Sequence, residues 1–234
     1  MKASVSTIAC TLLCMAPPTF AASFNFGDLA NEVPATFLTC STTDRCATTL
    51  GGALVYSDSG VTVSASGSYK GNAAVATAVQ DAFSSGKPAG LGVYHQVTYN
   101  TVGNTTTISV QNTADDNVSF EEKLTLDFGN QLVKITQILF RNGDHNTNFT
   151  GKFGLSIDNV ALADQTLINN YTTALTGKVF TFSGLKAGTT NLETEKFYIN
   201  AMTVAVVPEP EAYGLAMAGM GVVAFAMRRR RHGA

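Results

Sequence analysis

Lys123-Leu124-Thr125-Leu126-Asp127-Phe128 carries the clearest structural signal in this chain. Its apolar residues occupy every second position, so that they point to one face of an extended strand while the polar residues point to the other. An antiparallel sheet with one buried and one solvated face produces this pattern. Gly129-Asn130 follows as a turn, and residues 132–140 return as a second strand. The stretch therefore predicts an antiparallel sheet that covers a hydrophobic core.

Similar short segments recur between clusters of Gly, Asn, Asp and Ser, which is the spacing of antiparallel β-structure. For residues 72–83 the alanine content also suits a helix, but the β-branched residues recur at period two and favour a strand. Residues 167–175 are expected to form a short helix or an irregular crossover. The predicted strands are residues 23–26, 36–40, 53–56, 61–65, 72–83, 91–99, 105–110, 123–128, 132–140, 152–157, 160–162, 178–182 and 196–206.

This many short strands without helical periodicity predicts an all-β fold, an antiparallel two-sheet sandwich or jelly roll. In the last strand, Phe197, Ile199, Ala201 and Thr203 are expected to share one face.

Residues 1–22 have the pattern of a secretory signal peptide. Lys2 supplies a positive charge, residues 5–15 form a short apolar stretch, and Ala21 or Ala22 offers a small residue for cleavage. Removal of this segment would leave an exported domain, or ectodomain, of residues 23–207.

The carboxyl-terminal residues 208–234 hold three parts in order. Pro208, Glu209 and Pro210 form a break that continues neither a strand nor a helix. The uncharged residues 212–227 would make a helix of about 24 Å, slightly short of the ~30 Å hydrocarbon core. We predict one transmembrane helix here rather than a buried core helix, because no charged residue interrupts the run. The cytoplasmic stop would be Arg228, Arg229, Arg230 and Arg231.

This order of parts resembles the PEP-CTERM sorting signal. The resemblance implies export, a transient hold in the inner membrane, and cleavage near Pro208-Glu209-Pro210 by the membrane enzyme exosortase. It further implies a final place on the surface or in the extracellular matrix of a Gram-negative bacterium. Residues 90–128 are similar to β-rich ectodomains of other PEP-CTERM surface proteins, which implies a sandwich and no established chemistry.

Residues 23–207 contain fifteen acidic and ten basic residues, a net charge of −5. A mildly acidic exported domain does not suggest nucleic-acid binding. The only cysteines in this part are Cys40 and Cys46, for which an oxidising compartment predicts a small loop disulfide. Zinc is disfavoured because no histidine lies near the two cysteines in the sequence.

An acidic segment is the candidate metal site. Calcium takes six to eight oxygen ligands, and Asp144 and Asp158 could join if their loops approach. The alternative is that Asp and Asn start turns and keep loops soluble. The candidate Ca²⁺ ligands are Asp115, Asp116, Asn117, Glu121 and Glu122.

No motif predicts catalysis. His95 and His145 are the only histidines outside the tail, and the chain contains no Gly-x-Ser-x-Gly nucleophile elbow. We therefore expect a non-catalytic structural or interaction protein associated with exopolysaccharide. The alternative is a carbohydrate-binding module, with or without calcium. The chain has no tryptophan, so sugar-stacking rings would have to come from Tyr56, Tyr69, Tyr94, Tyr99, Tyr171 and Tyr198.

Overall fold

The computed structural model describes residues 21–28, 34–36, 39–40, 45–81, 89–95, 98–102, 105–109, 117–187, 192–193, 196–208, 214 and 217–222. The chain divides into two units: Phe20–Val207 is a folded domain, and Met1–Thr19 together with Pro208–Ala234 form the other.

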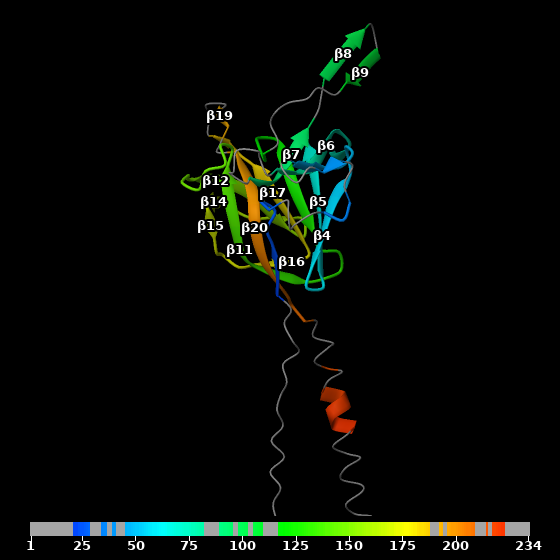
Figure 1. Cartoon of the computed structure of the whole chain (residues 1–234), viewed down its shortest axis with the longest axis vertical. Coiled ribbons are helices and arrows are strands. Elements are labelled where there is room, and N and C mark those ends of the chain that lie inside the picture. Colours follow the sequence, from blue (N-terminus) through cyan, green and yellow to red (C-terminus); the bar gives the residue numbers. More distant parts are fainter. Residues whose placement is uncertain are drawn as a thin grey trace, which may run out of the picture. The chain divides into compact units, whose positions relative to one another are not determined.

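The folded domain is built almost entirely from β-strands (Figure 1). In the described parts of the domain, one short 3₁₀ helix, η1 (Ala73–Val75), interrupts them. The strands are β1 (Ala21–Phe24), β2 (Thr39–Cys40), β3 (Arg45–Ala47), β4 (Ala53–Asp58), β5 (Val61–Tyr69), β6 (Ala76–Asp81), β7 (Gly90–His95), β8 (Thr98–Val102), β9 (Thr105–Ser109), β10 (Glu122–Asp127), β11 (Val133–Asn142), β12 (Gly151–Ile157), β13 (Val160–Ala161), β14 (Gln165–Leu167), β15 (Asn170–Tyr171), β16 (Leu175–Gly177), β17 (Val179–Gly184), β18 (Lys186–Ala187), β19 (Leu192–Glu193) and β20 (Phe197–Val206).

Two antiparallel sheets form the sandwich that the sequence predicts. The first sheet has the order β15-β11-β20-β7-β6-β3-β2, with β1 beside β20 and β16 beside β11. The second has the order β13-β12-β17-β10-β5-β4, with β14 beside β12. The core lies between their inner faces, where Leu124 and Leu126 of the hexapeptide are fully buried. The strand predicted from residues 123–128 is thus confirmed as β10, in the middle of the second sheet.

The predicted face of the last strand is partly wrong. Phe197 and Ile199 point into the core, but the next inward residues are Met202 and Val204 rather than Ala201 and Thr203. The pairing of β20 with β11 shifts register between Leu139 and Phe140. Such an irregularity adds one residue on one strand, so the side chains beyond it change faces.

Two other segments differ from prediction. The strand expected at residues 72–83 begins only at Ala76, because the Asn72 side-chain oxygen accepts a hydrogen bond from the Ala74 amide and starts η1 instead. Residues 167–175, expected as a helix or crossover, contribute to the short strands β14, β15 and β16, which pair with β12 and β11. Sheet pairing satisfies their backbone groups without a helix.

The first strand overlaps the predicted signal peptide. β1 pairs with β20 from Ala21 onward, and the Ala22 side chain is buried. A leader that ended at residue 22 would therefore remove the first two residues of β1. The rest of the predicted leader lies outside the described residues.

In the tail, residues 217–222 are helical. No helix within the described residues is both long and apolar enough to cross a membrane. Most of the predicted span 212–227 lies outside them, so the transmembrane helix stays a prediction.

Candidate functional site

The predicted calcium ligands do not converge within the described part of the chain. Asp115 and Asp116 lie outside it. Glu121 forms an ion pair with Lys70 at 3.2 Å, whereas Glu122 is turned into the domain and wholly buried. Asn117 as a whole is 6% exposed, and its Oδ1 atom has no hydrogen-bond partner among the described residues.

Of the two additional acids, Asp158 uses its carboxylate locally. Asp158 accepts hydrogen bonds from the Lys178 and Val179 amides, both at 2.9 Å, while the Asp144 amide bonds to Asn142. Among described residues, no three His, Cys, Asp or Glu side chains gather in a metal-binding group. A calcium site that uses Asp115 and Asp116 stays a prediction.

Glu122 is instead the centre of a buried polar cluster. Its Oε2 atom accepts hydrogen bonds from the Ser119 amide and the Ser119 hydroxyl, both at 2.7 Å. Its Oε1 atom lies 2.5 Å from His95 Nδ1. The His95 ring stacks on Tyr69 with centroids 3.8 Å apart. The cluster joins β5, β7 and β10 at one edge of the core.

The order of groups in this cluster differs from that of an acyl-transfer triad. In such a triad the imidazole stands between the serine and the acid, so that it can take the serine proton. Here the carboxylate of Glu122 stands between Ser119 and His95. The three residues therefore hold one another in place, in an arrangement that is not that of an acyl-transfer triad.

The pKa of Glu122 makes the stability of the domain depend on pH. Burial raises this pKa above its ordinary value of 4.5, while the hydrogen bonds from His95 and Ser119 oppose the rise. A raised folded pKa stabilises the fold below the unfolded pKa, and this contribution is lost as pH rises through the folded value.

Glu122→Gln is expected to remove that dependence. The free energy of unfolding of the wild type minus that of the variant should be largest below pH 4.5 and fall as pH rises. Urea titrations of the full-length chain, followed by circular dichroism at several pH values, measure this difference. His95→Phe removes a hydrogen bond that lowers the pKa of Glu122. In this variant, the stability that Glu122 contributes should therefore be lost at a higher pH than in the wild type. A difference that grows with pH would contradict the assignment.

The second histidine has a comparable setting. His145 Nε2 lies 3.7 Å from an oxygen of the buried Asp81, and its ring meets Tyr198 edge-on at 5.1 Å. Both histidines of the folded domain thus face a buried carboxylate and a tyrosine ring. Side chains enclosed in this way contribute to the packing of the domain.

Most of the candidate sugar-stacking tyrosines are unsuitable. Tyr56, Tyr171 and Tyr198 are buried in the core, and Tyr69 is covered on one face by His95. Tyr94 is half-buried, and the side chain of Tyr99 lies outside the described part. The expectation of a tyrosine platform is therefore wrong for the three buried rings.

The two cysteines of the predicted pair lie on neighbouring strands. Cys40 of β2 is the register partner of Cys46 of β3 in an antiparallel pair, and the Cys46 side chain is buried. Cβ atoms of directly opposed residues lie about 4.5–5.5 Å apart, close to the separation that a disulfide requires. The disulfide between Cys40 and Cys46 stays a prediction.

The outer surface of the second sheet is unusually rich in hydroxyl groups. We name the outward Ser and Thr residues of β4, β5, β10, β17 and β12 the hydroxyl face. Along these strands, core residues alternate with outward ones, most of which are polar or small; Val55 and Val179 are the apolar exceptions. The members of the hydroxyl face are Ser57, Thr62, Ser64, Ser66, Ser68, Thr125, Ser156, Thr181 and Ser183.

Strand register aligns four of these residues across the sheet. Ser66 is paired with Thr125, Thr125 with Thr181, and Thr181 with Ser156. We name this set the hydroxyl row. The Oγ1 atoms of Thr125 and Thr181 are 3.1 Å apart. Along a single strand the sequence shows which residues point outward, but only the register between strands reveals the row.

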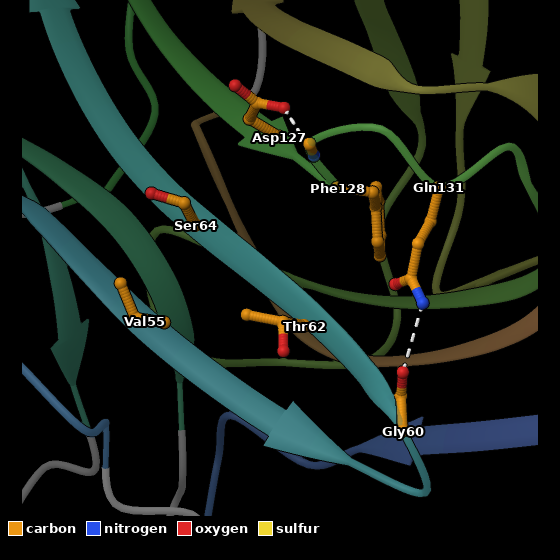
Figure 2. A pocket seen from close by; sticks show the side chains of 8 residues that line it. Val55, Gly60, Thr62, Ser64, Asp127, Phe128 and Gln131 are labelled. Carbon is orange, nitrogen blue, oxygen red and sulfur yellow. Dashed lines mark hydrogen bonds between the residues drawn. The ribbon is translucent and has the colours of Figure 1, made fainter.

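An open groove of about 440 Å³ lies at one end of the hydroxyl face (Figure 2). Thr62 and Ser64 line it from β5, and Asp127 lines it from β10. Across it, Gln131 Nε2 donates a hydrogen bond to the Gly60 carbonyl at 3.0 Å, joining the β4–β5 and β10–β11 turns. The lining holds one carboxylate, whereas glycoside hydrolysis uses two facing ones. The groove can hydrogen-bond a hydroxyl-rich ligand.

The sorting tail follows the folded domain without a linker. β20 is hydrogen-bonded to β11 on one side and to β1 and β7 on the other. After it ends at Val206, the Val207 amide still donates to the Leu132 carbonyl at 2.9 Å. Pro208 comes next. The first residue of the predicted processing motif is therefore separated in the sequence from the end of β20 by Val207 alone.

One comparison with known proteins identifies the tail. The family model for the PEP-CTERM protein-sorting motif matches residues 206–231. No curated protein and no solved structure matches the chain. The match confirms the sorting signal inferred from Pro208-Glu209-Pro210, the apolar run and the arginines.

Proposed function

We propose that this chain, which carries the carboxyl-terminal motif of exosortase substrates, serves outside the cell as a non-catalytic matrix protein associated with exopolysaccharide. The motif indicates a secreted protein that is held transiently in the membrane, processed by exosortase and then exposed at the surface. The match to this motif is the single observation that carries the proposal.

The ectodomain supports a binding or structural role. Its hydrophobic core is closed between two sheets, and its outer polar face presents hydroxyl groups rather than a cluster of titratable ones. Its only histidines face buried carboxylates. A Gram-negative host, in which exosortase sorting is expected from the resemblance, is part of the same proposal.

Fractionation of the native host tests this function. The protein is expected in the surface or extracellular fraction, and its intact mass should lack the residues that follow the Pro-Glu-Pro motif. Deletion of the host's exopolysaccharide synthesis should release it into the medium. Recovery of the full-length chain from the cytosol would overturn the proposal, and surface retention that is indifferent to exopolysaccharide would overturn its matrix part.

A second function, carbohydrate binding, is favoured by the hydroxyl face and its groove. Ser and Thr hydroxyls both donate and accept hydrogen bonds, as sugar hydroxyls do. In this function the domain would recognise the polysaccharide directly rather than be trapped within it.

A further inference from the structure

We propose that the hydroxyl face is the docking surface for an uncharged, extended polysaccharide chain that lies across the strands along the hydroxyl row. This inference rests on the proposed function, because it requires an exported protein that meets polysaccharide. It adds the binding surface and the charge class of the partner.

The composition of the surface indicates an uncharged partner. The five strands present sixteen outward positions, of which nine carry hydroxyls and three carry charges, Lys123, Asp127 and Lys152. No charged residue interrupts the hydroxyl row. An acidic polymer would be met by a cluster of basic side chains, and this surface has none among its outward residues. The surface is nearly neutral and rich in hydrogen-bonding groups. It therefore complements a neutral polymer that also carries many hydrogen-bonding groups.

The geometry of the row indicates an extended chain. Neighbouring strands lie about 4.8 Å apart, so the four residues from Ser66 to Ser156 span roughly 14 Å in a straight line. An extended polysaccharide repeats its hydroxyl groups once per sugar ring. The length of one ring along the polymer is similar to the distance between neighbouring strands. Each contact is weak, but a polymer repeats it along its length and gains by multivalency.

The groove extends the same surface. Ser64 and Asp127 are register partners that flank the hydroxyl row on the side of the groove. The Asp127 carboxylate accepts a hydrogen bond from the Gly129 amide at 2.7 Å, which orients it. A carboxylate accepts hydrogen bonds from two neighbouring hydroxyls of one sugar. The groove therefore offers a recessed position for a single ring beside the flat row.

The test removes hydroxyls without removing volume. The variant Thr125→Val, Thr181→Val, Ser66→Ala deletes three of the four hydroxyls of the row, and because Thr125 and Thr181 face each other, neither is left with an unpaired partner. Valine keeps the shape and strand preference of threonine. The matched control is Thr203→Val, a half-buried threonine on the first sheet.

Binding is measured with the full-length chain in a zwitterionic detergent, by affinity electrophoresis in gels that contain dextran, a soluble β-glucan or a galactomannan, and in a gel that contains anionic alginate. We expect the wild type to be retarded by at least one neutral polymer. The triple variant should bind roughly tenfold more weakly or worse, and the Thr203→Val control should bind as the wild type does. Thermal melting by circular dichroism verifies that all three chains are folded.

Two results would overturn the inference. One is wild-type binding to no neutral polymer, or binding to alginate alone that salt abolishes. The other is binding that the triple variant retains in full. Either result leaves export and tail processing untouched, so fractionation of the host tests the proposed function separately.

Discussion

A chain in which Pro208, Glu209 and Pro210 are all replaced by alanine is expected to accumulate in the inner membrane as a full-length precursor. The motif lies within the region that matches the PEP-CTERM model, and exosortase is the processing partner that the motif implies. Alanine removes both fixed proline φ angles and favours helix, so the break between β20 and the apolar run would be lost. Cell fractionation and intact-mass measurement of the carboxyl terminus detect the change.

The folded domain should tolerate this replacement. The motif begins directly after Val207, whose amide donates to the Leu132 carbonyl, so the replaced residues follow β20 in the sequence. A matched control replaces the exposed Thr172 and Thr173 by alanine, and it should be processed like the wild type. Unchanged surface display of the motif variant, together with an unchanged mass of its carboxyl terminus, would show that the motif is not the processing signal.

Phe140→Ala is expected to destabilise the domain by about 3–5 kcal/mol. Phe140 is fully buried on β11, and its ring meets Phe197 of the same sheet at 5.6 Å and Phe153 of the opposite sheet at 5.2 Å. Tyr171 and Phe182 lie at 6.4 Å. Truncation leaves a cavity between the two sheets, which the rigid strands around it cannot refill.

Urea unfolding of the full-length chain measures the effect of Phe140→Ala. Because the protein has no tryptophan, far-ultraviolet circular dichroism is the suitable signal. Lys134→Ala, at an exposed position of the same strand, should change the free energy of unfolding by no more than about 0.5 kcal/mol. A loss below about 1 kcal/mol for Phe140→Ala would mean that the sheets do not meet at this ring.

The strands with a strong local pattern were predictable from sequence. In Leu124, Leu126 and Phe128 the alternation of apolar and polar residues was regular, and the structure buries all three side chains. Local pattern was insufficient at β20, where the register shift beside β11 moved Met202 and Val204 into the core. A β-bulge depends on the partner strand, which lies some sixty residues away in the sequence, as with Ile138 and Met202.

For the candidate sites, too, the local sequence did not show which side chains lie together. The acidic residues Glu121 and Glu122 were adjacent in sequence and formed one candidate site, yet the structure gives them separate partners, Lys70 and His95. Glu121 lies in the turn before β10, with a φ of +67°, whereas Glu122 is the first residue of the strand, so the two carboxylates are held in different backbone conformations although they are adjacent in the sequence. Conversely, Ser66 and Thr181 belong to one row although no local motif connects them.

By itself, the sequence determined the route and the class of this protein: the sorting tail, recognised from contiguous residues, and the β-sandwich, recognised from alternation. Both can be recognised in short stretches of sequence, because a proline break, an apolar run and a two-residue period do not depend on residues elsewhere in the chain. Only the tertiary structure decided which side chains meet: the burial of Glu122 against His95, the shifted face of β20 and the hydroxyl row. Those depend on inter-strand register, which is set by hydrogen bonds and packing between residues far apart in the chain.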